Sequence, residues 1–182
     1  MEEHTTVNEQ YTFTSKAKRL TFILMGIGII GLILGAVKGH DDHWNRFFGN
    51  ILTNSFFFMS IGLAAAFFVA VQYAAEAAWG VVLKRVFEAV MAFLPIGAVC
   101  IVLILILGQL HVHGMYHWMH PEVYDIANVE FDEIIAHKQP YFHTIFFWAR
   151  TLIFLGGYIW AARLLRRRSL EEDRIGGTQL YF

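Results

Sequence analysis

The chain has 182 residues, of which 57% are hydrophobic and 16% aromatic, and its mean hydropathy is +0.48. Only 16% of the residues are charged, against roughly 25% in an ordinary soluble domain, and the formal net charge is −1. This balance excludes a disordered chain, a coiled coil and a protein that binds nucleic acid through a basic surface.

The hydrophobic residues gather into long runs, which predict membrane-spanning helices. A helix needs about 20 mostly apolar residues to cross a hydrocarbon core roughly 30 Å thick. A soluble bundle would show a polar face on each helix, and the stretch ILMGIGIIGLILGAV has none. The predicted fold is an all-α integral membrane protein, a four-transmembrane-helix bundle with spans at about 20–37, 50–75, 89–110 and 141–162.

Lysine and arginine residues in the short flanks orient this bundle. Ten lie on the side that holds both termini and three on the opposite side, and the basic side of a membrane protein is the inner one. Both termini are therefore predicted to be cytoplasmic, with a tail at 1–19, a His-rich periplasmic loop at 111–140 and a basic tail at 163–182. The first span is predicted to be a retained anchor, because no small-residue cleavage site follows it.

Small residues predict where the spans pack, because close backbone approach holds helices together in lipid. Gly31 and Gly35 form a small-xxx-small pair in the first span, and Gly62 lies in an alanine-rich second span. Pro95 lies in the third span and predicts a kink, since proline has no backbone donor. Cys100 is the single cysteine of the chain and is interpreted as a packing residue.

Eight of the nine histidines map to the predicted outer side, four of them in the segment HVHGMYHWMH. If the third span continued as a helix through this segment, His113, His117 and His120 would share one face. One interpretation is a copper or zinc site. Another is haem held between facing helices, although the spans hold no interior histidine and no CxxCH motif occurs. The favoured interpretation is a polar interfacial segment that packs against a partner subunit.

Arg150 lies inside the fourth run and is predicted near the middle of the bilayer. An arginine there costs about 2.5–3.5 kcal/mol on insertion scales and usually has a partner. No carboxylate lies inside the other three runs, so the partner is expected from a run end, a bound ligand or another chain.

Polar residues at the inner ends of the second and third spans are the other pointer to function. Gln72 and Glu76 lie one helical turn apart, and Glu88 begins the third run. A carboxylate buried there would take protons from the cytoplasm. The alternative is an interfacial carboxylate paired with Lys84 or Arg85.

Two long segments carry a resemblance, YTFTSKAKRLTFILMGIGIIGLILG and NRFFGNILTNSFFFMSIGLAAAFFVAVQYAAEAAWGVVLKRVFEAVMAFLPIG. Residues 11–110 resemble the ActF-type, quinone-binding-type membrane subunit of bacterial alternative complex III, and HGMYHW and FFWAR resemble it more loosely. That family is similar to the NrfD/PsrC membrane anchors, which have a four-helix core. No single short motif carries the match.

The resemblance implies a subunit of a quinol:cytochrome c oxidoreductase of the bacterial inner membrane, with no complete active site on this chain. The chain itself would bind neither haem nor cluster, and quinol is the one cofactor left open for it. Iron–sulfur clusters and c-type haems would lie in partner subunits. These partners would be an NrfD-like quinol subunit, an iron–sulfur subunit and multihaem cytochromes c, with a terminal oxidase as a further partner.

The implied role is to anchor the electron-transfer subunits and to contribute to quinol binding or proton transfer. The candidates for a proton path are Gln72, Glu76, Lys84, Glu88, Arg150 and His143, and the weak metal candidates are His113, His117 and His120. Family members continue with further spans, so the sequence is either a shorter homologue or an N-terminal part. A non-catalytic scaffold and an outer-face copper- or haem-handling protein are the alternatives.

Overall fold

The computed structural model describes residues 13–39, 44–75 and 80–175. All regular elements in these ranges are helices. The chain divides into two units, residues 1–41 and 42–182.

The first unit contains one long helix, α1 (Ser15–Gly39). Thr14 begins it by accepting a hydrogen bond from the Ala17 N–H at 3.3 Å, in the manner of a helix cap. Large apolar side chains are exposed along the whole of α1. The helix covers the predicted span 20–37 and adds a turn or more before it. The packing role of Gly31 and Gly35 stays a prediction.

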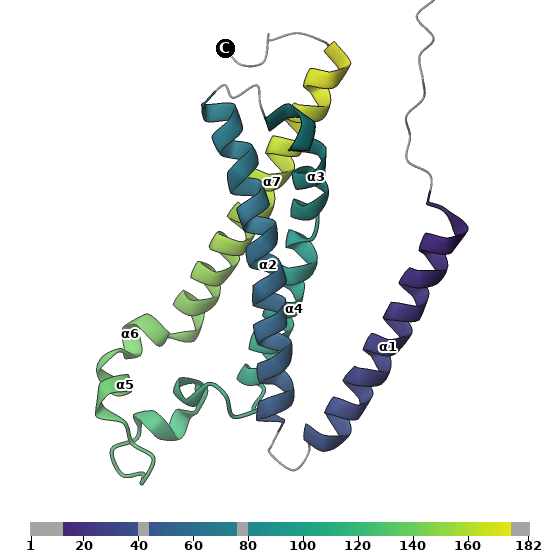
Figure 1. The fold of residues 1–182 in the computed structure, drawn as a ribbon. Coiled ribbons are helices and arrows are strands. Elements are labelled where there is room, and N and C mark those ends of the chain that lie inside the picture. The colour runs from purple at the N-terminus through teal and green to yellow at the C-terminus, as the bar shows by residue number, and fades with distance from the viewer. Residues whose placement is uncertain (1–12, 40–43, 76–79, 176–182) are drawn as a thin grey trace, which may run out of the picture. The chain divides into compact units, whose positions relative to one another are not determined.

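The second unit is built around α2 (Asn45–Ala74), which packs along α3 (Val81–Met91) and α4 (Leu94–Gln109) (Figure 1). Small residues make the α2–α4 approach close. A Cβ atom at Gly62 would lie 3.2 Å from the Leu94 side chain, and one at Gly97 would lie 2.9 Å from the Cβ of Met59. The predicted packing of the second span through small residues is confirmed at Gly62.

The third predicted span consists of two helices that are interrupted at Ala92 and Phe93. Pro95 explains the interruption, because its ring nitrogen cannot donate to the Met91 carbonyl and its ring clashes with that carbonyl. The Phe93 N–H instead bonds to the Val90 carbonyl at 3.2 Å, three residues back. The predicted kink is confirmed, and it is a break between α3 and α4.

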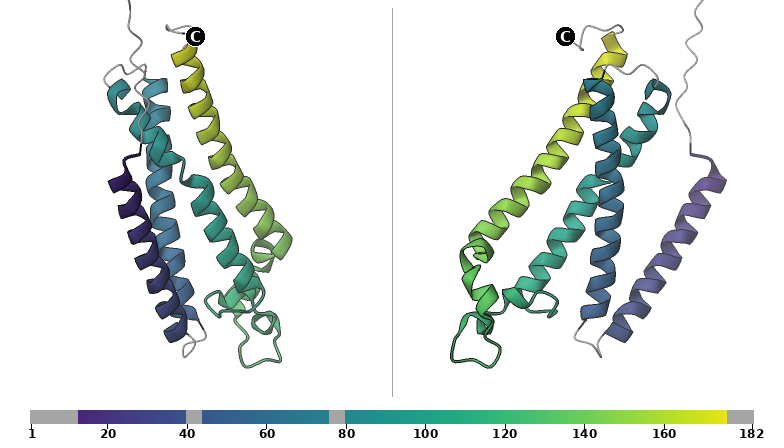
Figure 2. Two further views of the ribbon diagram at one scale, coloured as in Figure 1. Left: turned by 90° about the vertical axis from the view of Figure 1, so that its right-hand side faces the viewer. Right: turned by 60° about the vertical axis from the view of Figure 1, so that its left-hand side comes forward.

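The last long helix, α7 (Thr144–Ile175), is thirteen residues longer at its C-terminal end than the predicted span 141–162. No glycine or proline interrupts residues 163–175, so the charged tail continues the helix. Its C-terminal half lies near α2 and α3, whereas its N-terminal half diverges from α2 (Figure 2). The core of the unit joins these helices, with buried side chains of Met59, Ala65, Met91, Leu94, Ala98 and Ala162.

The connection between α4 and α7 lies at the opposite end of the unit from the C-terminal end of α7 (Figure 1). It contains the short helices η3 (His117–Met119), η4 (Pro121–Tyr124), α5 (Glu133–His137) and α6 (Gln139–Phe142). Asp132 caps α5 by accepting hydrogen bonds from the N–H groups of Ile134 and Ile135, at 2.9 and 3.2 Å. The predicted loop 111–140 therefore contains short helices joined by irregular segments.

Within the described residues, four helical stretches are long and apolar enough to cross a membrane: Ser15–Gly39, Asn45–Ala74, Val82–Gln109 and Thr144–Arg174. Their large apolar side chains are mostly exposed on the outside of the helices. Exposed apolar surface of this extent is typical of a surface covered by lipid or by other protein. The chain is thus all-helical, with four candidate membrane spans.

The close approach at Gly97 gives a test of the α2–α4 packing. Gly97→Ala places a Cβ against Met59 and should lower the free energy of unfolding by about 1–3 kcal/mol, because the two backbones must separate. Gly156→Ala is the matched control in α7, where a Cβ meets nothing within 4 Å. That change should be neutral or stabilise by up to about 1 kcal/mol. Thermal unfolding of the full chain in detergent, followed by circular dichroism, measures both, and equal effects would contradict the close approach.

Candidate functional site

A cluster of charged and polar side chains joins α2, α3 and α7 at the end where α7 terminates. We call it the Lys84 cluster. Its members are Gln72, Tyr73, Lys84, Arg85, Glu88, Glu172 and Asp173.

At its centre Lys84 Nζ lies 2.6 Å from Glu172 Oε2, and the two side chains are only 12% and 14% exposed. The Tyr73 hydroxyl donates to the same carboxylate oxygen at 3.1 Å, and Lys84 Nζ lies 4.7 Å from the centroid of the Tyr73 ring. One carboxylate of α7 thus binds α2 and α3 together.

Arg85 extends the cluster along α3. Its guanidinium pairs with Glu88 on the same helix and with Asp173 on α7. Glu88 is 3% exposed, and its second oxygen, Oε1, has no hydrogen-bond partner among the described residues. Glu88 thus combines features of both interpretations, because its side chain is buried and it pairs with Arg85.

Gln72 lies at the edge of the cluster, against Gly80 at the start of α3. A Cβ at Gly80 would fall 1.8 Å from Gln72 Nε2, so a side chain at position 80 would require the buried Gln72 amide to move. In the described part of the chain, Gln72 Nε2 and the fully buried Ser169 Oγ have no hydrogen-bond partner. The predicted neighbour Glu76 lies in residues 76–79, outside the described residues.

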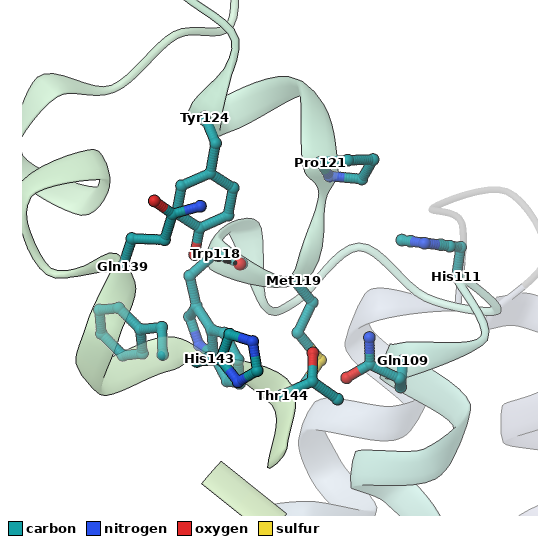
Figure 3. A pocket seen from close by; sticks show the side chains of 10 residues that line it. Gln109, His111, Trp118, Met119, Pro121, Tyr124, Gln139, His143 and Thr144 are labelled. Carbon is teal, nitrogen blue, oxygen red and sulfur yellow. Dashed lines mark hydrogen bonds between the residues drawn. The ribbon is translucent and has the colours of Figure 1, made fainter. Parts of the chain in front are cut away.

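The opposite end of the unit has a cavity of about 370 Å³. Figure 3 shows Gln109 and His111 on one side of it and Gln139 and His143 on the other. Aromatic side chains form its wall: the Trp118 ring stacks on Phe142, with centroids 5.0 Å apart. His143 therefore opens into a polar and aromatic cavity outside α7, at the junction of α6 and α7.

The Tyr124 hydroxyl braces this wall. It donates to the Trp118 carbonyl at 2.9 Å. Burial raises the pKa of the Tyr124 hydroxyl above its usual range, so the group stays neutral near pH 7 and keeps its donor hydrogen.

The His113 side chain does not point into solvent but turns back and packs on α4. Its ring is 2% exposed, and Nε2 lies 3.0 Å from the Ile104 carbonyl. Since a carbonyl only accepts, Nε2 carries the proton. The ring packs on Phe48 of α2 at a centroid distance of 4.9 Å, and a Cβ at Gly108 would lie 2.9 Å from it.

The prediction of one histidine face is wrong. Helix α4 ends at Gln109, and His111 adopts a left-handed conformation with φ of 57°, so the helix does not continue through the segment. His113 is buried, His117 begins η3, and the His120 ring lies 4.8 Å from that of His111. In the ranges that the structure describes, no three His, Cys, Asp or Glu side chains form a group that could hold a metal ion.

Arg150 is the seventh residue of α7 and not its midpoint. The apolar run ends at Ala162, twelve residues or about 18 Å further along the axis, so the depth of Arg150 near the middle of the bilayer stays a prediction. Its guanidinium lies over the Tyr141 ring at 3.8 Å from the centroid, and over Phe146 at 5.4 Å. The contact expected from a run end is thus aromatic, a cation–π interaction. Nη1 has no hydrogen-bond partner among the described residues.

The structure thus brings Lys84 and Glu88 into one ion-paired cluster with Gln72 beside it, and separates them from His143 and Arg150. Sequence reasoning missed Tyr73, Glu172 and Asp173. A usable signal was the uninterrupted helical sequence from 163 to 175, which carries Glu172 and Asp173 onto α7.

No known protein-family model matches the chain, and a comparison with curated proteins finds no match either.

The Lys84–Glu172 pair gives a test of the cluster. Glu172→Gln leaves the poorly exposed ammonium of Lys84 without its counter-charge and should lower the free energy of unfolding by about 3 kcal/mol. The double variant Lys84→Met/Glu172→Met should recover much of that loss, since it removes both charges. Glu171→Gln is the matched control, because its pair with Arg167 is exposed and contributes less than about 1 kcal/mol. Equal losses for Glu171→Gln and Glu172→Gln would contradict the role of the pair.

The fold-back of His113 gives a second test. His113→Ala removes both the bond to Ile104 and the packing on Phe48, and should cost about 3 kcal/mol of unfolding free energy. Amide hydrogen exchange over residues 108–116 should accelerate in the same variant. His137→Ala is the control, since its side chain is 80% exposed. Unchanged exchange in His113→Ala would show that the ring does not hold the turn.

Proposed function

We propose that the chain is a multi-pass subunit of the bacterial inner membrane that anchors electron-transfer subunits in a complex of the alternative complex III type. The four candidate spans support a bundle, and the basic residues support cytoplasmic termini. Arg85 on α3 contacts Asp173 on α7. The basic residues Lys84 and Arg85 and the arginines of 163–174, which are predicted on the inner side, therefore lie at the same end of the second unit.

One observation carries the anchoring role: among the described residues, the buried polar side chains lie at the two ends of the second unit, and the buried side chains between them are apolar. Between the Lys84 cluster and His113, the buried core consists of Met59, Ala65, Met91, Leu94 and Ala98. A proton path needs polar groups or water along its length, whereas apolar packing suits a scaffold. This favours anchoring over proton transfer for Lys84 and Glu88. Lys84 is already paired with Glu172 of α7, and Glu88 is paired with Arg85 on its own helix.

Contribution to quinol binding is the second candidate. The cavity beside His143 supports it, because its size of about 370 Å³ and its aromatic wall with a few polar groups are typical of small-molecule sites. The partners of the complex follow from the resemblance: subunits that carry the iron–sulfur clusters and c-type haems.

Purification of the tagged chain from its native membrane in mild detergent tests the proposal. We expect c-type haem absorbance and quinol:cytochrome c reductase activity to co-elute with the chain. The α1 variant Gly28→Leu/Gly31→Leu is compared with Gly156→Leu/Gly157→Leu in α7, because all four positions have open space around a Cβ. Reduced co-elution in one pair alone would locate the partner face. A chain that elutes without haem in every case would overturn the proposal.

A further inference from the structure

One face of α7 borders two neighbouring cavities that share their arginines. The first, of about 220 Å³, lies between the α3–α4 break and α7 and is walled by Met91, Leu94, Pro95, Ile159 and Ala162. The second, of about 420 Å³, is an open surface hollow lined by α7 alone, beside Arg167 and Arg174. Arg163 and Arg166 line both. An apolar space thus adjoins a basic one at two shared side chains.

The basic face arises because α7 sorts its charges by helical position. Arg163, Arg166, Arg167 and Arg174 are spaced by three, four and eleven residues from the first, which places them on one face. Glu172, nine residues after Arg163, points the other way and pairs with Lys84. Asp173, seven residues after Arg166, lies at one edge of the basic face and pairs with Arg85. Glu171 lies at the other edge and pairs with Arg167 at 3.0 Å.

Arg163 and Arg166 keep their charge available. Both are exposed, and within the described residues neither makes an ion pair. The apolar space beside them follows from the break before Pro95: α3 ends at Met91 and α4 begins at Leu94, so side chains of a continuous helix do not fill the gap against Ile159.

The depth of these residues fits a lipid headgroup. Arg163 directly follows the apolar run that ends at Ala162, and Arg166 lies about 4.5 Å further along the axis at 1.5 Å per residue. The headgroup layer of a bilayer begins where the hydrocarbon ends and is about 5–7 Å thick on each side. Both guanidinium groups therefore reach the level of lipid phosphates, and the apolar cavity lies at the level of the acyl chains.

We propose that this face of α7 binds one anionic phospholipid. Arg163 and Arg166 hold the phosphate diester, since guanidinium groups match phosphate oxygens, and an acyl chain fills the cavity between Pro95 and Ile159. The inference rests on the membrane placement of α7 and is independent of the electron-transfer complex. A soluble anion would use the arginines alone and would leave the apolar cavity without a role.

The test compares lipids on the full chain in neutral detergent micelles, with native mass spectrometry as the readout of bound lipid during titration. Phosphatidylglycerol should bind at least about tenfold more tightly than phosphatidylcholine, because two basic side chains near a headgroup each contribute to attraction of an anionic lipid. In Arg163→Gln/Arg166→Gln the affinity for phosphatidylglycerol should fall to that for phosphatidylcholine. Arg168→Gln, which removes a charge from another face, should change it less than about threefold.

Two further variants separate the parts of the site. Ala92 is exposed at the mouth of the apolar cavity, so Ala92→Phe should weaken phosphatidylglycerol binding several-fold without removing a charge. Glu171→Gln should strengthen it, since it removes a carboxylate at the edge of the face and leaves the charge of Arg167 unpaired. Retained circular dichroism shows that each variant is folded.

Glycerol 3-phosphate serves as the probe for a headgroup without acyl chains. It should neither bind measurably at millimolar concentration nor displace phosphatidylglycerol. If it competes as well as the lipid, the arginines form a simple anion site and the proposal is wrong. Equal weakening by Arg168→Gln and by the double variant would also overturn it, because the attraction would then come from the net charge of the helix.

Discussion

The Lys84–Glu172 ion pair is the interaction on which the arrangement of the second unit depends. It joins α3 to α7 at 2.6 Å and lies largely out of solvent, where a lone charge would be costly. Tyr73 of α2 binds the same carboxylate, so three helices meet at one oxygen atom, Oε2 of Glu172. The pair forms because α7 continues as a helix past its apolar run and carries Glu172 to the start of α3.

This pairing also determines which surface of α7 stays charged. Glu172 and Asp173 pair with Lys84 and Arg85 across the helix contact, and Glu171 pairs with Arg167. A segment whose sequence mixes five arginines with three carboxylates thereby becomes a helix whose carboxylates are all paired, while Arg163 and Arg166 keep a basic face. The packing of the helices and the proposed lipid site are two results of one division of charge.

The sequence predicted the four apolar helices and the break at Pro95, because both depend on local chemistry: the length of an apolar run and a missing backbone donor. It predicted the pairing of Glu88 with Arg85 as one of two alternatives for the same reason, since they lie one turn apart. Glu172 was missed because its partner lies 88 residues away. The predicted histidine face does not form. Because Gly108 has no side chain, His113 can turn back and bind the Ile104 carbonyl near the end of α4.

The two polar ends of the unit differ in what they can do. At the Lys84 cluster the charged side chains form ion pairs between α3 and α7. Replacing one of them should therefore lower the stability of the fold first. At the other end, His143, His111 and the two glutamines surround a cavity and make few contacts with one another. Between the ends, Met59, Leu94 and Ala98 exclude polar groups from the helix interface. A ligand that approaches the His-lined cavity thus meets a site separated from the Lys84 cluster by apolar packing, and any coupling between the two must act through the position of α7.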